Sequence, residues 1–104
     1  MIQELNVNNF YQEINKDKPV VVEFYTTACS HCKKLAGALN KLSEEKGDDV
    51  FFGKCNIDQE ALLQSRFDIS AVPTLLFIKN GEIKNRLVGE VHPLIIQEEI
   101  KKLA

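Results

Sequence analysis

The chain has 104 residues, of which 44% are hydrophobic, and its formal net charge is −2. This length and apolar content predict one globular domain over residues 1–104, with a core of its own. Charges of both signs are interspersed, so the sequence offers no basic stripe for nucleic acid, and no apolar run approaches the roughly 20 residues of a membrane span. We therefore expect a monomer that recognises protein partners by surface shape.

The cysteines give a first indication of chemistry. The opening residues, "MIQELNVNNF", show no basic leader followed by an apolar run, so we expect a cytoplasmic protein. Structural disulfides are rare in that reducing compartment, where paired cysteines tend to be catalytic or metal-bound. The three cysteines are Cys29, Cys32 and Cys55.

The first half of the chain predicts a strand-helix-strand unit. Residues 2–6 are a possible edge strand and residues 8–18 a first helix. "KPVVVEFYT" is a nearly continuous apolar run, typical of a strand buried on both faces. Apolar residues then recur at helical spacing up to about Lys46, before Gly47, and "DVFFGKCNID" is a second buried strand. Two such strands joined by a helix are expected to be parallel.

The second half predicts a hairpin and a closing helix. Asp58 is a plausible N-cap for a short helix over residues 59–67. The apolar runs "TLLFI" and "EIKNRLV" flank Asn80-Gly81, which favours a type I′ turn between antiparallel strands. Pro93 suits the first turn of a last helix. Its expected apolar side comprises Leu94, Ile95, Ile100 and Leu103.

The predicted order is therefore β-α-β-α-β-α-β-β-α, an α/β fold in which a mixed sheet lies between helices. Within it, the motif "CSHC" falls at a strand-to-helix junction. A zinc site needs about four ligands, and only Cys29, His31 and Cys32 are local. Covalent haem attachment needs a histidine where Lys33 stands. A redox pair is the favoured interpretation; a metal site and an incidental pair of helix cysteines are the alternatives.

The position of the two cysteines favours redox chemistry. Cys29 falls at the start of the helix, where free N–H groups and the helix dipole stabilise a thiolate. Cys32, one turn further in, is expected to be more buried. We predict that Cys29 attacks a substrate disulfide and that Cys32 then resolves the mixed disulfide.

Two charged residues stand inside the predicted strands. Glu23 interrupts "VVVEFY", where a buried acid is costly unless it is paired or used. We expect a carboxylate of raised pKa that takes the proton from Cys32, with Lys54 as its candidate partner. The alternatives are an acid at a frayed strand end and a lysine that reaches the surface. Cys55 is expected to face the opposite side of the sheet from Lys54, as a small core residue.

Several motifs together resemble the thioredoxin family over nearly the whole chain. They are the CxxC motif within a βαβ unit, "VPT" at residues 72–74, and "FIKNGE" followed by "LVGE". The resemblance implies a thioredoxin fold and a protein-disulfide reductase that needs no metal and no cofactor beyond a Cys29–Cys32 disulfide. It further implies protein disulfides as substrates and a reductase of the thioredoxin-reductase type as electron donor.

The resemblance also assigns roles to matching positions. Cys29 matches the nucleophile and Cys32 the resolving thiol. Pro73 matches a cis-proline that packs against the cysteines, and the backbone of Val72 matches the segment that pairs with an extended substrate. Gly89 matches a glycine that lets the substrate approach.

This sequence departs from the family pattern around the motif. Ala28 stands at the substrate-contacting position of a usual tryptophan, and Ser30 and His31 replace Gly-Pro. His31 can stabilise the Cys29 thiolate, which predicts a reduction potential above that of an ordinary thioredoxin. Glu90 adds a charge to a surface that is usually small and apolar, which is expected to disfavour acidic substrates.

Other departures bear on the choice of function. Glu23 and Tyr25 stand where thioredoxins commonly have Asp and Trp, which is closer to the catalytic domains of protein disulfide isomerase. The leading hypothesis is a disulfide reductase. His31 favours an oxidase or isomerase as the alternative of the same class, and a non-catalytic binding module or metal carrier is the alternative of a different class.

Overall fold

The predicted order of strands and helices is confirmed in the computed structural model, which describes residues 2–104. The strands are β1 (Gln3–Glu4), β2 (Val20–Tyr25), β3 (Phe51–Asn56), β4 (Thr74–Lys79) and β5 (Glu82–Val88). The helices are α1 (Phe10–Ile14), α2 (Ser30–Lys46), α3 (Ala61–Arg66) and α4 (Pro93–Leu103). As predicted, α2 ends at Gly47, which is its C-cap residue.

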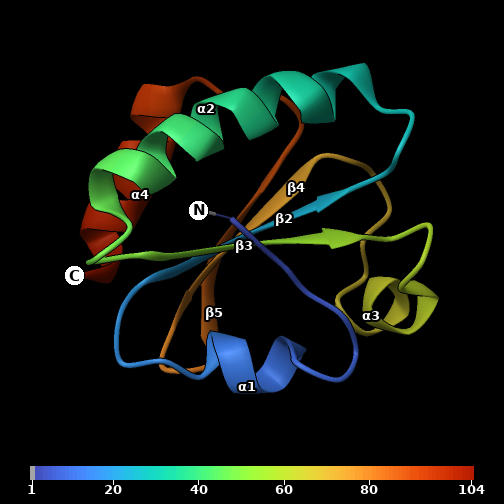
Figure 1. Cartoon of the computed structure of the whole chain (residues 1–104), viewed down its shortest axis with the longest axis horizontal. Helices are drawn as coiled ribbons and strands as arrows, with labels where there is room; N and C mark the ends of the chain where they lie inside the picture. The colour runs from blue at the N-terminus through green and yellow to red at the C-terminus, as the bar shows by residue number, and fades with distance from the viewer. Residues whose placement is uncertain (1) are drawn as a thin grey trace.

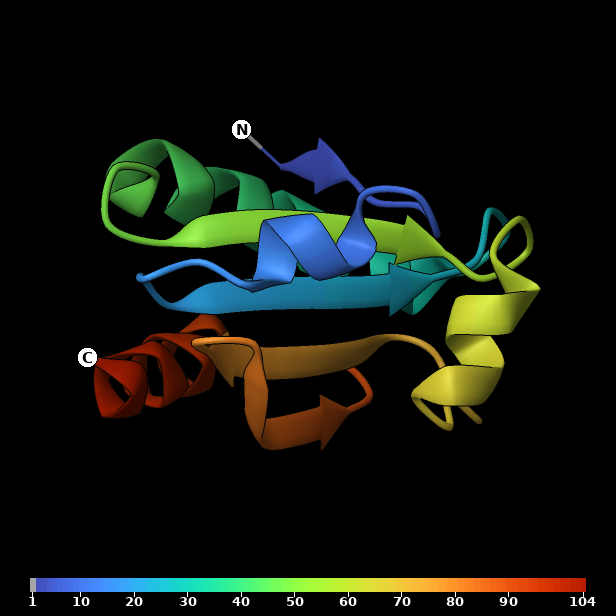
Figure 2. The same ribbon diagram turned by 90° about the horizontal axis from the view of Figure 1, so that it is seen from below.

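The strands form one mixed sheet in the order β1-β3-β2-β4-β5 (Figure 2). β1, β3 and β2 are parallel, whereas β4 is antiparallel to both β2 and β5. Parallel pairing brings the carboxyl ends of β2 and β3 to one edge of the sheet, where Tyr25 pairs with Asn56. Antiparallel pairing brings the start of β4 to the same edge, where Thr74 pairs with Phe24. The segments that follow β2 and β3 and precede β4 therefore converge there.

Helices cover both faces of the sheet, with α2 and α4 on one side and α1 and α3 on the other (Figure 1). Side chains alternate along β2, so Val22 packs in the core on the α1 and α3 side and Val21 in the core under α2 and α4. The same alternation turns Glu23 toward the face that α2 covers. The core under α2 and α4 also includes Leu35, Leu39, Phe52, Leu75, Phe77 and Ile96.

The hairpin between β4 and β5 has the predicted turn. Asn80 and Gly81 both have positive φ, 54° and 78° respectively. Positive φ at both central residues is the requirement of a type I′ turn, whose twist matches that of the two strands.

α4 begins at Pro93 as predicted, but its first turn contributes less to the core than expected. Leu94 is 61% exposed and Ile95 47% exposed, so the prediction that both lie on the apolar side was wrong. The buried stripe repeats at intervals of four and three residues, which is one face of a helix, and the two exposed residues lie off it. Its apolar members are Ile96, Ile100 and Leu103.

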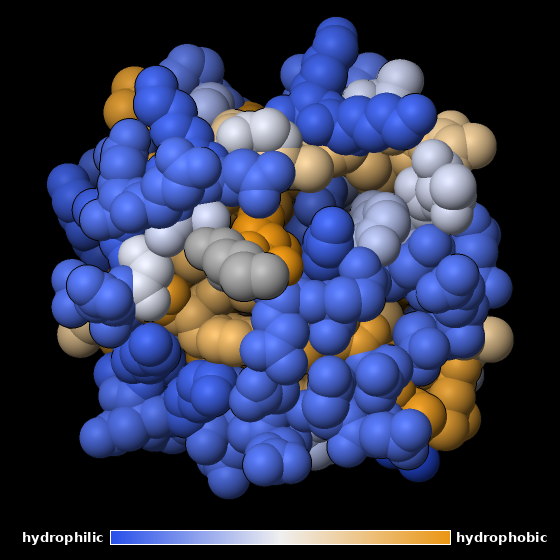
Figure 3. Space-filling view, viewed as in Figure 1, coloured by the Kyte–Doolittle hydropathy of each residue, from blue (hydrophilic) through white to orange (hydrophobic). Residues whose placement is uncertain are grey.

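One face of the molecule is largely polar (Figure 3). Hydrophilic side chains dominate the face shown in Figure 3, with apolar groups visible in patches between them. None of the helices within residues 2–104 combines the length and apolar character that a membrane-spanning helix needs.

Candidate active site

The loop between β2 and α2 is fastened to the end of β3. The Thr27 N–H donates to the Asp58 carboxylate at 3.1 Å, and the Asn56 amide donates to the Thr27 hydroxyl at 3.1 Å. Asp58 is therefore not the predicted N-cap; Glu60 precedes α3 and makes no side-chain cap. Because the ends of β2 and β3 meet at one edge, the Thr27 N–H is the donor that Asp58 reaches.

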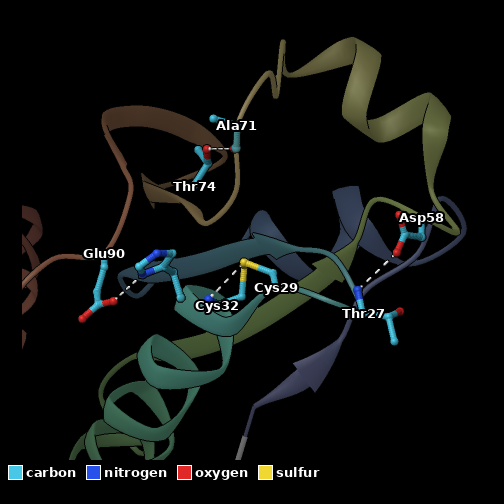
Figure 4. Close-up of a disulfide and its surroundings, with 8 residues drawn as sticks. Thr27, Cys29, Cys32, Asp58, Ala71, Thr74 and Glu90 are labelled. Atoms are coloured by element: carbon cyan, nitrogen blue, oxygen red, sulfur yellow. Dashed lines mark hydrogen bonds and ion pairs between the residues drawn. A yellow bond between two sulfur atoms is a disulfide. The ribbon is translucent and has the colours of Figure 1, made fainter.

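The two cysteines of the motif form a disulfide at the first turn of α2 (Figure 4). Cys29 is the N-cap residue, and its sulfur accepts a hydrogen bond from the Cys32 N–H at 3.1 Å. Cys29 is half-buried, whereas Cys32 is 3% exposed. The free N–H groups of a helix start stabilise negative charge, so this position favours a thiolate at Cys29 once the disulfide is reduced.

A pocket of about 310 Å³ lies beneath the pair and brings together Glu23, Cys32 and Lys54. Glu23 exposes 1% of its surface, and its Oε2 is without a hydrogen-bond partner among the described residues. Burial raises the pKa of Glu23 to about 7, and the positive charge of Lys54 opposes that rise. The residue is thus a buried acid within β2 and not one at a frayed strand end. The other residues that line the pocket are Tyr25, Thr26, Thr27, Lys33, Ala36 and Asn56.

Lys54 faces this pocket but forms its ion pair elsewhere. The strand register places Lys54 opposite Glu23 on one side and Glu4 on the other. Its Nζ lies 3.9 Å from the Glu4 carboxylate and 5.8 Å from the centre of the Tyr25 ring. The Tyr25 hydroxyl lies 2.9 and 3.0 Å from the two Glu4 oxygens, to which it donates, and burial together with this bond raises the Tyr25 pKa. The sequence did not indicate this use of Glu4.

The segment before β4 reaches the same edge of the sheet, where Thr74 pairs with Phe24. The Val72-Pro73 peptide bond is cis, as the resemblance implied. The Gly89 N–H donates to the Pro73 carbonyl at 2.8 Å, which places the loop after β5 beside the proline. Gly89 has a φ of 93°, and a Cβ there would meet nothing within 4 Å, so the position faces open space. An L-residue that has a side chain rarely adopts this backbone conformation, whereas glycine adopts it readily.

The residues around the motif lie at the surface. Ala28 and Ser30 are exposed on either side of Cys29. The His31 Nδ1 lies 2.7 Å from the Glu90 Oε1, a contact between residues 59 apart in the chain. The bond from His31 lowers the pKa of Glu90. No local sequence pattern signals such a contact, because it depends on how the loop after β5 approaches α2.

The remaining cysteine and histidine lie away from the disulfide. Cys55 is fully buried in the core on the α1 and α3 side, as predicted, and burial raises its pKa to about 12. His92 is the N-cap of α4, where its Nδ1 accepts from the Leu94 N–H at 3.1 Å. In residues 2–104, His, Cys, Asp and Glu side chains nowhere gather in threes or more in a way that could hold a metal ion.

A mixed sheet with a helix-capping CxxC disulfide above a buried carboxylate defines a thiol-disulfide oxidoreductase. The family model described as Thioredoxin matches residues 1–102, and the chain belongs to the thioredoxin family. Thioredoxins act on protein disulfides together with thioredoxin reductase, and they need no cofactor beyond the redox-active disulfide.

Curated relatives carry the same family name. Thioredoxin from Alicyclobacillus acidocaldarius is 37% identical over 81 residues, which cover 78% of this chain and 77% of the relative. Thioredoxin-1 from Saccharomyces cerevisiae is 37% identical over 93 residues, covering 89% and 88%. The mitochondrial thioredoxin of Mus musculus is 36% identical over 86% of this chain, but the match spans 54% of that longer protein.

Solved structures agree with these relatives. Thioredoxin Mala s 13 from Malassezia sympodialis has a TM-score of 0.88 at 32% identity, covering 98% of this chain and 92% of the other. Oxidised mitochondrial thioredoxin 3 from S. cerevisiae has a TM-score of 0.87 at 30% identity, covering 98% and 95%. The family, the fold and the disulfide together identify this protein as an enzyme that catalyses thiol-disulfide exchange.

Proposed function

We propose that this chain works as a reductant of protein disulfides, with Cys29 as the attacking thiolate and a reductase partner as its electron donor. The observation that carries the proposal is the Cys29–Cys32 disulfide at the first turn of α2, directly above the pocket that holds Glu23. Cys29 is more exposed than Cys32, and the Glu23 carboxylate lies in the same pocket as Cys32, where it can accept a proton.

In the first step, the Cys29 thiolate attacks one sulfur of the substrate disulfide. A bond forms between Cys29 and that sulfur, and the other substrate sulfur leaves as a thiolate that takes a proton from solvent. Cys29 suits this role because it is the more accessible cysteine and receives the N–H bond of the helix start.

In the second step, the Cys32 thiol gives its proton to the Glu23 carboxylate and attacks the Cys29 sulfur. The Cys29–Cys32 disulfide forms, and the second substrate sulfur leaves as a thiolate. That thiolate takes a proton from solvent, and Glu23 returns its proton to solvent. The substrate has then gained two electrons and two protons, and the partner's dithiol must supply two electrons to reduce the Cys29–Cys32 disulfide again. A pKa of about 7 lets Glu23 accept or release a proton near neutral pH.

The substrate is proposed to bind at the edge where the disulfide lies. The backbone of Val72, just before Pro73, would pair with an extended segment of the substrate, as strands do in a sheet. Gly89 is bonded to the Pro73 carbonyl and carries no side chain, which leaves room for that segment. Ala28 offers a small exposed contact beside Cys29.

Reduction of insulin disulfides, with dithiothreitol as electron donor, tests this function. The Cys29→Ser variant should lose turnover, whereas Cys55→Ala should keep it, since Cys55 is buried on the other side of the sheet. Turnover retained by Cys29→Ser would refute the assignment, and loss in both variants would point to misfolding, which circular dichroism would reveal.

His31 favours a more oxidising enzyme as the second candidate of the same class. Equilibration of the Cys29–Cys32 pair with a glutathione redox buffer separates the two, because an oxidase or isomerase holds its disulfide less stably than a reductase does. A non-catalytic binding module would instead keep its affinity for its partner in the Cys29→Ser variant. The cytoplasmic location and the monomeric state stay predictions.

A further inference from the structure

The contact between His31 and Glu90 joins the helix turn that carries the disulfide to the loop after β5. His31 lies in the first turn of α2, between the two cysteines, and Glu90 lies in the loop after β5. Their 2.7 Å contact is at the surface, with the His31 side chain 66% exposed and the Glu90 side chain 43% exposed. Figure 4 shows Glu90 reaching toward the helix turn that carries the disulfide.

The loop that carries Glu90 has a second anchor at the site. Gly89 donates its N–H to the carbonyl of Pro73, and Val88 pairs with Thr74 in the sheet. The backbone beside Glu90 is thereby held against the segment before β4, while its side chain reaches across to His31. The anchored loop therefore positions the Glu90 carboxylate next to the His31 imidazole.

The hydrogen bond between the His31 Nδ1 and the Glu90 carboxylate limits how far His31 can stabilise a thiolate at Cys29. The bond requires the proton on Nδ1, so His31 donates toward Glu90 with that nitrogen. Glu90 is ionised at neutral pH, as an exposed glutamate ordinarily is. The bond from His31, with smaller effects from the charges of Lys34 and His31, lowers its pKa further. Its negative charge offsets any positive charge on His31, so the pair offers the Cys29 sulfur less stabilisation than a free histidine would.

We propose that Glu90 is a positioning residue that holds His31 away from the Cys29 thiolate and so keeps the Cys29–Cys32 pair more reducing. The inference rests on the proposed role of Cys29 as the attacking thiolate. A histidine between the cysteines stabilises the reduced form only as far as its charge and its N–H reach the thiolate. The higher reduction potential that the sequence predicts from His31 should then be seen in full only when Glu90 is replaced.

The test is a double-mutant cycle read out as a redox equilibrium. The parent, Glu90→Ala, His31→Ala and the double variant are each equilibrated with glutathione, and the fraction of Cys29–Cys32 disulfide is measured. Glu90→Ala should shift the equilibrium toward the dithiol by roughly threefold or more, which corresponds to a potential higher by about 14 mV. In the His31→Ala background the same substitution should have less than half of this effect.

Two further measurements sharpen the result. Glu90→Gln keeps an acceptor for His31 but removes the charge, and it should shift the equilibrium in the same direction by a smaller factor. The Cys29 thiol of reduced Glu90→Ala, followed by thiolate absorbance, should titrate at lower pH than in the parent. Glu98→Ala removes an exposed glutamate paired with Lys101 on α4 and should change neither quantity.

The proposal is overturned if Glu90→Ala leaves the equilibrium unchanged or makes the pair more reducing. It is also overturned if the shift is as large without His31, since Glu90 would then act on the thiolate directly. The equilibrium is measured on the cysteine pair itself, whereas the proposed function is decided by insulin turnover in Cys29→Ser. Either idea can therefore fail while the other stands.

Discussion

Glu23 and Cys32 line one pocket although they come from different elements, β2 and α2. The alternation of side chains along β2 turns the carboxylate toward α2, and the helical spacing turns the thiol of the buried cysteine down toward it. One carboxylate oxygen has no hydrogen-bond partner among residues 2–104. A buried carboxylate in that state is available to take up a proton from a neighbouring thiol.

Replacing Glu23 by Gln should slow the second step of exchange. Without the carboxylate, the Cys32 thiol must lose its proton to water, and a positioned base typically contributes about a hundredfold or more. We expect the mixed disulfide at Cys29 to decay roughly a hundredfold more slowly near pH 7, as followed by acid quenching and mass spectrometry. An unchanged decay rate would remove Glu23 from the mechanism.

Glu23 should also make stability depend on pH. Its folded-state pKa is raised from 4.5 to about 7, so between these values the folded chain binds more protons than the unfolded chain. The stability that the neutral acid provides is complete below 4.5 and is lost as the pH rises through about 7, a change of about 3 kcal/mol.

Denaturant unfolding of the disulfide form measures this effect without titrating the active-site thiols. Glu23→Gln should gain about 3 kcal/mol of stability over the parent as the pH rises from about 4 to about 8. Glu44→Gln, which alters an exposed glutamate on α2, serves as the matched control and should follow the parent. Parallel curves for Glu23→Gln and the parent would show that the acid is not perturbed.

Lys54 should hold the pKa of Glu23 down. Its positive charge opposes the effect of burial, so Lys54→Met should raise the pKa of Glu23 further. The pH at which the mixed disulfide decay reaches half its maximum should move upward. Lys41→Met replaces an exposed lysine on α2, away from the pocket, and should leave that pH unchanged. A downward movement in Lys54→Met would contradict the assigned electrostatics.

Two glycines should respond in opposite ways to alanine. Gly89 has a φ of 93°, so Gly89→Ala should destabilise the fold by about 1–2 kcal/mol although the added Cβ meets open space. Gly37 lies within α2, where a Cβ also meets nothing within 4 Å, so Gly37→Ala should stabilise by about 0.5–1 kcal/mol. Denaturant midpoints measure both, and equal effects would show that backbone conformation is not what distinguishes the two positions.

The sequence predicted the order of elements and the positions of Cys29, Cys32 and Glu23 because these depend on local patterns. Periodicity identifies buried strands and amphipathic helices, and a charge within an apolar run is visible by itself. The cis bond at Pro73 came from the family resemblance, and no local pattern in the chain would have given it.

The contacts that the sequence did not reveal join distant segments. The His31–Glu90 pair depends on the approach of the loop after β5 to α2. Asp58 follows β3 and could have been placed beside the loop after β2 from parallel pairing alone, although its position before a helical segment suggested a cap instead. Long-range side-chain contacts need the register of the sheet, which periodicity does not fix.

Trapping the mixed disulfide tests the chemistry of the site most directly. The Cys32→Ser variant should react with a disulfide-containing peptide to give a stable one-to-one adduct, because the resolving thiol is gone. Peptide mapping by mass spectrometry should place the bound peptide on Cys29 and leave the buried Cys55 free. No adduct, or an adduct on Cys55 in place of Cys29, would contradict the proposed function.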